Sequence, residues 1–242
     1  MKNLIYIPAT NGIQDELPYG IKTWEHYCIK HDIKLIISND LPPKNKEIYK
    51  NVNFQQYFTP KLVEEEYNRL LIVDCDTMIR WDAPNIFKEY PNHTFSVVKD
   101  ISGEGSGRYH LNQWLKFNPN IKTPPHNYFN TGFLLLSKEN YLELRNAILP
   151  YYEEYVRVKR GNLYKIDTSD QTPTNIIAYD LFKNDIKFLS DIWNDMVMFK
   201  YDDASFINNS YVWHFTGPRM GGWGNKSNLM KQVWDHVKDQ YV

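Results

Sequence analysis

The sequence predicts an α/β fold: a single Rossmann-like domain whose mostly parallel, mixed central sheet is flanked by helices. Two observations predict it. Short apolar runs alternate along the chain with longer segments whose apolar residues recur at helical spacing. The short runs are nearly continuous in apolar residues, as expected of strands buried on both faces. With 242 residues, of which 42% are hydrophobic, the chain can bury one sizeable core, so we expect one domain over residues 1–242.

The N-terminal segments predict two strands and two helices. Residues 4–9 (LIYIPA) form an apolar run that ends before a polar loop, which predicts the first strand. In residues 20–32 the apolar side chains recur at helical spacing, which predicts an amphipathic helix. Residues 33–38 predict the second strand, because a Pro-rich loop follows them. Pro60 stands at a typical first helical position, which predicts a helix over residues 60–67.

Two further strands precede a segment of different composition. Residues 69–74 (RLLIVD) and residues 94–98 (TFSVV) are apolar runs, and each predicts a buried strand. Residues 101–128 are rich in Gly, Pro and Asn, so we expect a long loop there, with a short helix over residues 111–116. A loop of this length is more often functional than idle, and it is a candidate lid over a bound ligand.

The C-terminal half continues the alternation. Residues 129–137 (FNTGFLLLS) predict a strand, and residues 138–158 predict a helix in which Pro150 is a kink or a boundary. The remaining elements are a helix over residues 169–182 with Ser169 or Asp170 near its cap, strands over residues 186–190 and 211–217, and a closing helix over residues 228–238.

Charge and cysteine content argue against several classes of protein. The net charge is -1, so there is no basic field to attract nucleic acid or an anionic membrane. No apolar stretch approaches the ~18 residues of a membrane span, and the N-terminus lacks the pattern of a signal peptide. Two cysteines are too few for a disulfide framework. We therefore expect a cytoplasmic protein with no transmembrane segment and no nucleic-acid partner.

Two carboxylates, Asp74 and Asp76, stand at the end of the buried strand predicted over residues 69–74. Residues i and i+2 of a strand point to the same side, so two such carboxylates can converge on one cation. Oxygen ligands suit Mg²⁺ or Mn²⁺. The alternative is a loop aspartate that caps the following turn through its backbone amides.

His214 ends another predicted strand and is followed by Gly217, Arg219 and a Gly-rich turn. A lone histidine after an apolar run is usually a core residue. Here glycine would let the backbone approach a phosphate closely, and the guanidinium would bind it in a bidentate manner. An imidazole added to Asp74 and Asp76 favours Mn²⁺ over Mg²⁺. These parts together fit a nucleoside diphosphate that carries a further group.

Six segments bear motifs that occur in the same order in a known family. They are IPATNG (7–12), TPKL (59–62), LLIVDCD (70–76), YFNTGFLLLS (128–137), DTSDQ (167–171) and HFTGPRMGGW (214–223). In these motifs the chain resembles family 8 glycosyltransferases, the retaining, metal-dependent group that includes glycogenin and bacterial lipopolysaccharide galactosyltransferases. The resemblance covers most of the chain. It implies an A-type fold and the transfer of a hexose from a UDP-sugar to an acceptor hydroxyl.

The resemblance also implies the roles of individual residues. The ligands of Mn²⁺ or Mg²⁺ would be Asp74, Asp76 and His214. The nucleoside and the diphosphate would be contacted by Thr10, Asn11, Gly217 and Arg219. The donor sugar would be surrounded by Lys61, Asn130, Asp167, Asp170 and Gln171. Of these, Asp170 and Gln171 would lie nearest the reacting carbon and are the catalytic candidates.

The chain departs from the family pattern at three positions. The family's Lys falls at Met220 and its Pro at Gly221, with Arg219 one position before them. The acidic residue usual after the first strand is replaced by Gly12. These departures bear on which nucleotide is bound more than on the class of reaction.

Several alternatives stay open at this point. The segment 130–132 could be a β-bulge, and Asp167 and Asp170 could cap the helix at 170–182. In the loop, the candidates for acceptor contacts are Tyr109, Trp114 and His126, which could equally be packing or surface residues. The acceptor could be a glycan, a lipid-linked glycan or a protein.

Two other functions compete with the transferase. A haloacid-dehalogenase-type phosphatase also places Asp-x-Asp after an apolar strand, and residues 202–203 could imitate its late acidic motif. That motif wants Thr or Val two positions after the second aspartate, where this chain has Met78. A catalytically inactive nucleotide-sugar-binding module is the non-enzymatic alternative.

Overall fold

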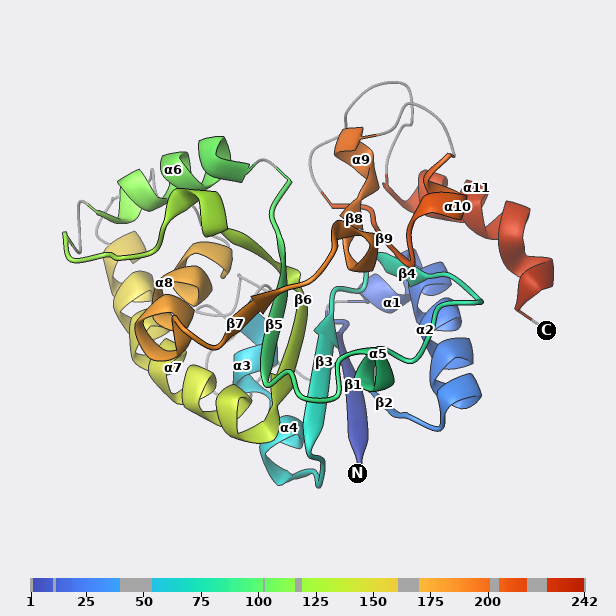
Figure 1. The fold of residues 1–242 in the computed structure, drawn as a ribbon, viewed down its shortest axis with the longest axis horizontal. Helices are drawn as coiled ribbons and strands as arrows, with labels where there is room; N and C mark the ends of the chain where they lie inside the picture. Colours follow the sequence, from blue (N-terminus) through green and yellow to red (C-terminus); the bar gives the residue numbers. More distant parts are fainter. Residues whose placement is uncertain are drawn as a thin grey trace.

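The computed structural model describes residues 2–10, 12–39, 54–101, 103–115, 119–160, 170–200, 205–216 and 226–241, without side-chain detail at 103–106, 151–160 and 199–200. These residues form a six-stranded sheet with the order β2-β1-β3-β6-β5-β7 and a three-stranded sheet with the order β4-β9-β8 (Figure 1). The large sheet comprises β1 (Asn3–Pro8), β2 (Lys34–Ser38), β3 (Arg69–Val73), β5 (Phe95–Lys99), β6 (Phe129–Ser137) and β7 (Ile186–Phe188). The small sheet comprises β4 (Thr77–Ile79), β8 (Asp195–Met196) and β9 (Val212–His214).

Strand directions in the large sheet are mixed. Strand β1 pairs in parallel with β2 and β3, and β5 pairs in parallel with β7. Strand β6 is antiparallel to both of its neighbours, β3 and β5. Five strands therefore run one way and β6 runs the other, which confirms the predicted mostly parallel, mixed sheet.

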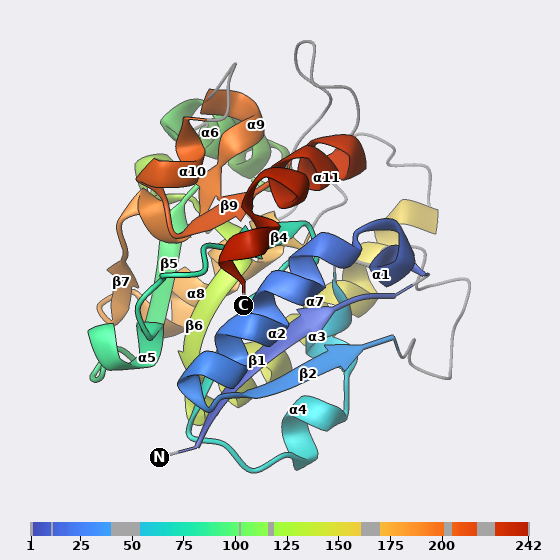
Figure 2. The same ribbon diagram turned by 90° about the vertical axis from the view of Figure 1, so that its right-hand side faces the viewer.

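Both faces of the large sheet are buried, which explains why its strands are apolar throughout. In β3, Leu70 and Ile72 contribute to one core and Leu71 and Val73 to the other. The first core is covered by α3 (Gln55–Phe58), α4 (Lys61–Glu64), α7 (Lys138–Arg160) and α8 (Gln171–Phe182). The second is covered by α2 (Pro18–His31) and α5 (Ile86–Glu89). Figure 2 shows α2 in front of β1, on the face opposite α7.

A third apolar cluster joins the small sheet to the C-terminal helix. It contains Met78 of β4, Trp213 of β9 and Met230 of α11 (Lys226–Val237). The other short helices are α1 (Ile13–Glu16), α9 (Val197–Lys200) and α10 (Phe206–Asn209), with 3₁₀ turns at Pro125–Asn127, Asp191–Trp193 and Lys238–Gln240. Within the described segments, no helix combines the length and the apolar character needed to cross a bilayer.

Two predicted elements were wrong in extent, and one of the two interpretations of Pro150 is excluded. The expected loop contains a three-turn helix, α6 (Gly103–Trp114), because Leu111 and Trp114 pack against Tyr128 and Ile176. Tertiary burial here overrides the weak helix propensity of a Gly-rich segment. The helix expected over residues 60–67 is the single turn α4, preceded by α3. Helix α7 continues through Pro150, which is therefore not a boundary.

Candidate active site

The turn between the two sheets carries both carboxylates. Strand β3 ends at Val73 and β4 begins at Thr77, so Asp74 and Asp76 stand where the chain passes from one sheet to the other. The Thr77 amide and hydroxyl both donate to the carbonyl oxygen of Asp74, at 3.1 and 2.6 Å. Trp24 of α2 donates to the same hydroxyl at 2.9 Å. The turn is thus closed by the main chain of Asp74, and the carboxylate is left to face His214.

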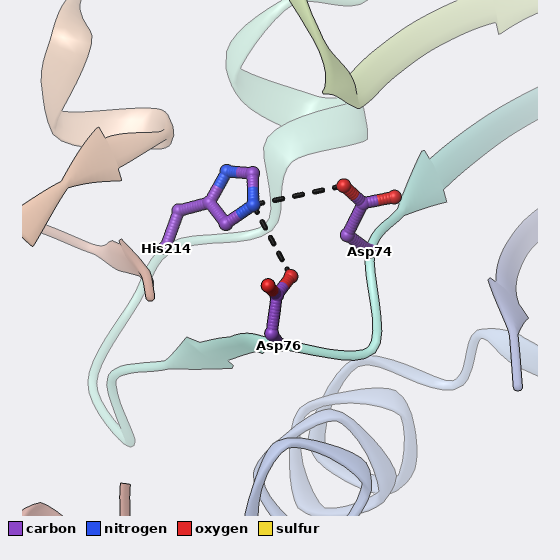
Figure 3. Close-up of side chains that lie close together, drawn as sticks. All are labelled: Asp74, Asp76 and His214. Carbon is purple, nitrogen blue, oxygen red and sulfur yellow. Dashed lines mark ion pairs between the residues drawn. The ribbon is translucent and has the colours of Figure 1, made fainter. Parts of the chain in front are cut away.

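Strand pairing brings His214 to this turn. Strands β4 and β9 are antiparallel, and Thr77 is the partner of His214. The ladder continues one step further, where the Phe215 amide donates to the carbonyl oxygen of Asp76 at 2.9 Å. Figure 3 shows one nitrogen of the imidazole facing both carboxylates. A residue far away in the sequence therefore meets the carboxylate pair through a short sheet that was not predicted.

The three side chains fit a divalent cation. His214 Nε2 lies 3.2 Å from Asp76 Oδ1 and 3.6 Å from Asp74 Oδ2. One ligand atom from each residue lies within 4.8 Å of the other two. His214 is fully buried, yet its Nε2 has no hydrogen-bond partner in the described part of the chain. Two carboxylate oxygens and one imidazole nitrogen that converge in this way form a donor set that can hold a divalent cation.

The electrostatics of the pair are asymmetric. Burial, and then the neighbouring Asp76 carboxylate, raises the pKa of Asp74 to about 6. Burial alone would also raise the pKa of Asp76, but His214 and Lys226 outweigh it and hold that pKa below its usual range. The Asp74 side chain keeps 41% of its surface exposed against 11% for Asp76, so the Asp74 carboxylate is the more exposed of the two.

Lys226, the first residue of α11, was not identified from the sequence. Its Nζ lies 2.5 Å from Asp76 Oδ2. Burial opposes the charge of this ammonium group, but Asp76 prevails and raises the pKa of Lys226. The site therefore contains a cation that no motif pointed to.

A cavity of about 390 Å³ opens beside the carboxylates. Its lining includes Asp74, Asp76, Thr10 and Lys226. Apolar side chains of α1 and the following residue also line it, namely Ile13 and Leu17, and so do Gln55 and Gln56 of α3. The structure thus brings the predicted nucleoside-contacting residue Thr10 to the same cavity as the carboxylate pair.

Three of the predicted sugar-contacting residues also come together. Asn130 Nδ2 donates to Gln171 Oε1 at 3.0 Å, and Gln171 Nε2 donates to Asp100 Oδ2 at 2.9 Å. Asp170 is buried and accepts hydrogen bonds from Gln56 at 2.7 Å and from Thr131 at 3.3 Å. Burial, and then the charge of Asp74, raises the pKa of Asp170 well above its usual range.

The sequence left two local alternatives open: a helix cap at Asp170 and a β-bulge at residues 130–132. Asp170 is the N-cap residue of α8, but its side chain makes no capping hydrogen bond. The β-bulge is present: Val97 of β5 pairs with Leu134 whereas Val98 pairs with Asn130, so residues 131–133 bulge out of the ladder. The irregularity lies in the same segment as the site, and so it does not compete with a functional interpretation.

Comparison with known proteins decides the family. The model for glycosyl transferase family 8 matches residues 15–226. The chain belongs to glycosyl transferase family 8. This membership confirms the resemblance found in the sequence and gives no support to a haloacid-dehalogenase-type phosphatase, whose proposed late motif at 202–203 lies outside the described residues. Among curated proteins, no sequence relative matches this chain.

Solved structures agree with the family 8 assignment. A glycosyltransferase involved in the glycosylation of the major capsid of PBCV-1 matches with a TM-score of 0.55 at 12% identity, over 90% of this chain and 95% of that one. The galactosyltransferase LgtC, in complex with donor and acceptor sugar analogs, matches with a TM-score of 0.54 at 14% identity, over 98% and 99%. Mouse xyloside xylosyltransferase 1 matches with a TM-score of 0.52 at 13% identity, over 91% and 99%. At these identities the likeness establishes the A-type glycosyltransferase fold.

One residue carried over from the family lines a different depression. Lys61 is exposed and borders this depression with Lys2, Lys34 and Glu64–Glu66, and the carboxylates are not part of its lining. The depression follows β2 from Lys34 to Ile37. Four further predicted residues lie outside the described part of the chain: Asn11, Asp167, Gly217 and Arg219.

The acceptor candidates have different environments. Trp114 is buried against Leu111 and Tyr128, which is the ordinary packing role that the sequence left open. Tyr109 on α6 is 63% exposed, and His126 is exposed as well. Only the last two are accessible to a second substrate.

Proposed function

We propose that this family 8 glycosyltransferase is a metal-dependent, retaining enzyme that moves a hexose from a UDP-sugar to the hydroxyl group of an unidentified acceptor. One observation carries the proposal: Asp74, Asp76 and His214 offer ligand atoms within 4.8 Å of one another. The two carboxylates also line a cavity together with Thr10 and Lys226. A cation site beside a cavity of this kind suits a nucleoside diphosphate. We propose that both sheets act together as one transferase domain.

We assign roles to the residues that line the cavity. Thr10 would contact the nucleoside, and Lys226 would bind the diphosphate through a charge-assisted hydrogen bond. A divalent ion held by the aspartates and His214 would stabilise the charge that the diphosphate gains on leaving. The imidazole ligand favours Mn²⁺ over Mg²⁺. The roles implied by the family resemblance are kept for Asn11, Lys61, Asp167, Gly217 and Arg219.

For the chemical step we propose attack on the face from which the diphosphate leaves. The acceptor oxygen forms a bond to the anomeric carbon, the bond from that carbon to the phosphate oxygen breaks, and the acceptor proton passes to the leaving phosphate. This route retains the anomeric configuration without a protein nucleophile. Asp170 is poorly suited to be one, because both of its oxygens accept hydrogen bonds inside the protein. The amides of Asn130 and Gln171 would position the sugar.

The test is the Asp76→Asn substitution. It removes one ligand charge and should lower Mn²⁺-dependent release of UDP from a panel of UDP-hexoses by at least about 100-fold, equivalent to about 2.7 kcal/mol. The matched control is Asp82→Asn, which changes an exposed carboxylate paired with Arg80 and should leave turnover unchanged. Undiminished turnover by the parent protein after EDTA treatment, or parent-like Mn²⁺-dependent turnover by Asp76→Asn, would refute metal-dependent catalysis.

The same samples separate an enzyme from a binding module. Calorimetric titration with UDP and Mn²⁺ reports binding, and the hydrolysis assay reports turnover. Binding of UDP with Mn²⁺ but without hydrolysis or transfer of any UDP-hexose would favour the inactive nucleotide-sugar-binding module.

We also propose a cytoplasmic location. It is supported by Cys28 and Cys75, which are both free thiols, as expected where thiols are kept reduced. A glycan, a lipid-linked glycan and a protein all remain in the proposal as acceptors.

A further inference from the structure

We propose that Asn194 is a positioning residue that fixes one proton of His214 on Nδ1, so that in the neutral imidazole the lone pair lies on Nε2 and faces Asp74 and Asp76. The interpretation of this lone pair as a metal ligand rests on the proposed function. The position of the proton itself does not, because it follows from hydrogen bonds among the described residues. No motif in the sequence singled out Asn194.

The chain of hydrogen bonds begins at a donor whose identity is certain. The backbone amide of Gly132 can only donate, and it lies 2.9 Å from Asn130 Oδ1. That end of the Asn130 side chain must therefore be its oxygen. The other end is the NH₂ group, which donates to Gln171 Oε1, and the Gln171 NH₂ group in turn donates to Asp100. A backbone amide at one end and a carboxylate at the other set the orientation of both amides.

The same reasoning extends to the histidine. Because Asn130 Oδ1 can only accept, the Asn194 atom 3.0 Å away from it must be the NH₂ group. The opposite atom of Asn194 is then its oxygen, and it lies 2.9 Å from His214 Nδ1. An oxygen acceptor at this distance requires a proton on Nδ1. In the neutral imidazole the remaining nitrogen, Nε2, carries the lone pair, and this is the atom nearest to Asp74 and Asp76.

Backbone structure holds Asn194 in place. The residue follows the 3₁₀ turn Asp191–Trp193 and precedes β8, and it is 1% exposed. Strand β8 is parallel to β9, with Met196 as the partner of His214. The ladder that positions the imidazole therefore also positions its hydrogen-bond acceptor, so the contact does not depend on a mobile side chain.

The consequence is a ligand that needs no rearrangement before it binds a cation. An imidazole free to exchange its proton would present Nε2–H to the carboxylates for part of the time. Residues that orient a metal-binding histidine through its other nitrogen typically contribute 10- to 100-fold, as an order of magnitude, to metal affinity. We assign this role to Asn194.

The first experiment determines which ring nitrogen of His214 carries the proton. Long-range ¹H–¹⁵N correlation spectra of ¹⁵N-histidine-labelled, EDTA-treated protein at pH of about 8, above the ordinary histidine pKa, distinguish the two neutral forms. The chain has 7 histidines, and the His214→Gln variant identifies the relevant signals. The expected result is the Nδ1–H form of His214. A spectrum with the proton on Nε2, or with exchange between both nitrogens, would overturn the proposal.

The second experiment separates the two hydrogen bonds of Asn194. Asn194→Asp keeps an oxygen for His214 Nδ1–H but no longer donates to Asn130, whereas Asn194→Leu loses both. We expect the affinity for Mn²⁺ alone to stay within about 3-fold of the parent in Asn194→Asp and to fall about 10- to 100-fold in Asn194→Leu. Asn209→Asp, at an exposed position in α10, controls for the added charge.

Each result has a defined meaning. Parent-like affinity for Mn²⁺ in a folded Asn194→Leu protein would contradict a positioning role. If that variant fails to fold, the spectra of the parent and the titration of Asn194→Asp still decide, and a large loss of affinity in Asn194→Asp would also overturn the proposal. None of these measurements needs a sugar donor, so a protein that shows the Nδ1–H form but hydrolyses no UDP-hexose would refute the proposed function and leave this inference standing.

Discussion

At Gly132, strand β6 comes close to the side chains of His214 and Asp74. A Cβ atom at this position would clash with Cε1 of His214 and lie 2.5 Å from Oδ2 of Asp74 and 2.9 Å from Oδ1 of Asn130. Real Cβ atoms do not make contacts this short, so one side chain would have to move. The glycine of the Asn-Thr-Gly segment is therefore required by contact between side chains and not by an unusual backbone angle.

We predict that Gly132→Ala weakens binding of Mn²⁺ by more than about 10-fold, because the methyl group displaces His214 or Asp74. Overpacking should also lower the free energy of unfolding by about 1–3 kcal/mol. Mn²⁺ titration followed by electron paramagnetic resonance, together with urea denaturation, measures both. Thr131→Ser, which removes a methyl group from the adjacent residue and keeps its hydroxyl, serves as the control. Parent-like Mn²⁺ affinity in Gly132→Ala would show that the contacts at Gly132 do not shape the site.

At the scale of elements, helix α2 supports the turn that carries the carboxylates. Thr23 Oγ1 accepts a hydrogen bond from the Ile79 amide at 3.1 Å, and Trp24 donates to Thr77 at 2.9 Å. Gly20 brings the helix backbone so close that an added Cβ would lie 2.5 Å from the Thr77 carbonyl oxygen and 2.6 Å from that of Cys75. The turn is thus clamped between α2 and the two sheets, which keeps its carboxylates in register with His214.

We predict that Gly20→Ala destabilises the protein by about 1–3 kcal/mol, because α2 must move away from the turn. On an exposed helical position the same change would stabilise by up to about 1 kcal/mol, since alanine has the higher helix propensity. Urea denaturation gives the sign directly. Glu25→Ala, at an exposed position of the same helix, is the control and should have little effect. A more stable Gly20→Ala protein would mean that the backbone contact is not made.

At the scale of the whole molecule, the residues of the site come from distant segments of the chain. The cavity is lined by the end of β1, by the turn after β3 and by the start of α11, and His214 comes from the small sheet. One long-range link is the ion pair between Lys226 and Asp76, which are 150 positions apart. The C-terminal helix is thereby tied to the turn that joins both sheets, and its ammonium group stands beside the proposed cation site.

We predict that Lys226→Gln raises the affinity for Mn²⁺ alone by about 3- to 10-fold, because a like charge beside Asp76 is removed. The gain should shrink as salt is added, since the ammonium group is partly exposed. The affinity for UDP in the presence of Mn²⁺ should fall if Lys226 binds the diphosphate. Calorimetric titrations measure both quantities. Lys231→Gln, on the same helix and paired with Asp235, is the control. Unchanged Mn²⁺ affinity in Lys226→Gln would show that the ion pair has no influence on the site.

The local pattern of apolar and polar residues was sufficient to predict the class of fold and to single out the carboxylate pair. Continuous apolar runs predicted β3 and β6, because a strand buried on both faces has no polar side to alternate. Asp74 and Asp76 stood out as charges directly after such a run, and His214 as a polar residue that ends another. Motif order then identified the family. Each single motif lies within a few neighbouring residues, where sequence and local structure are directly coupled.

Contacts between distant residues were decided only by the tertiary structure. Helix α6 forms in a Gly-rich segment because Leu111 and Trp114 find a partner surface on α8. Lys61 belongs to a motif that resembles the family's, but only the fold shows that its side chain lines a depression with Lys2 and Lys34. Asn194 and Lys226 carry no local signal, since each is important only through a neighbour 20 or 150 positions away. By itself the sequence determined which residues are buried and which chemistry is present. The packing of two sheets and a C-terminal helix decided which of those groups meet, because a hydrogen bond or an ion pair depends on distance in space and not on spacing along the chain.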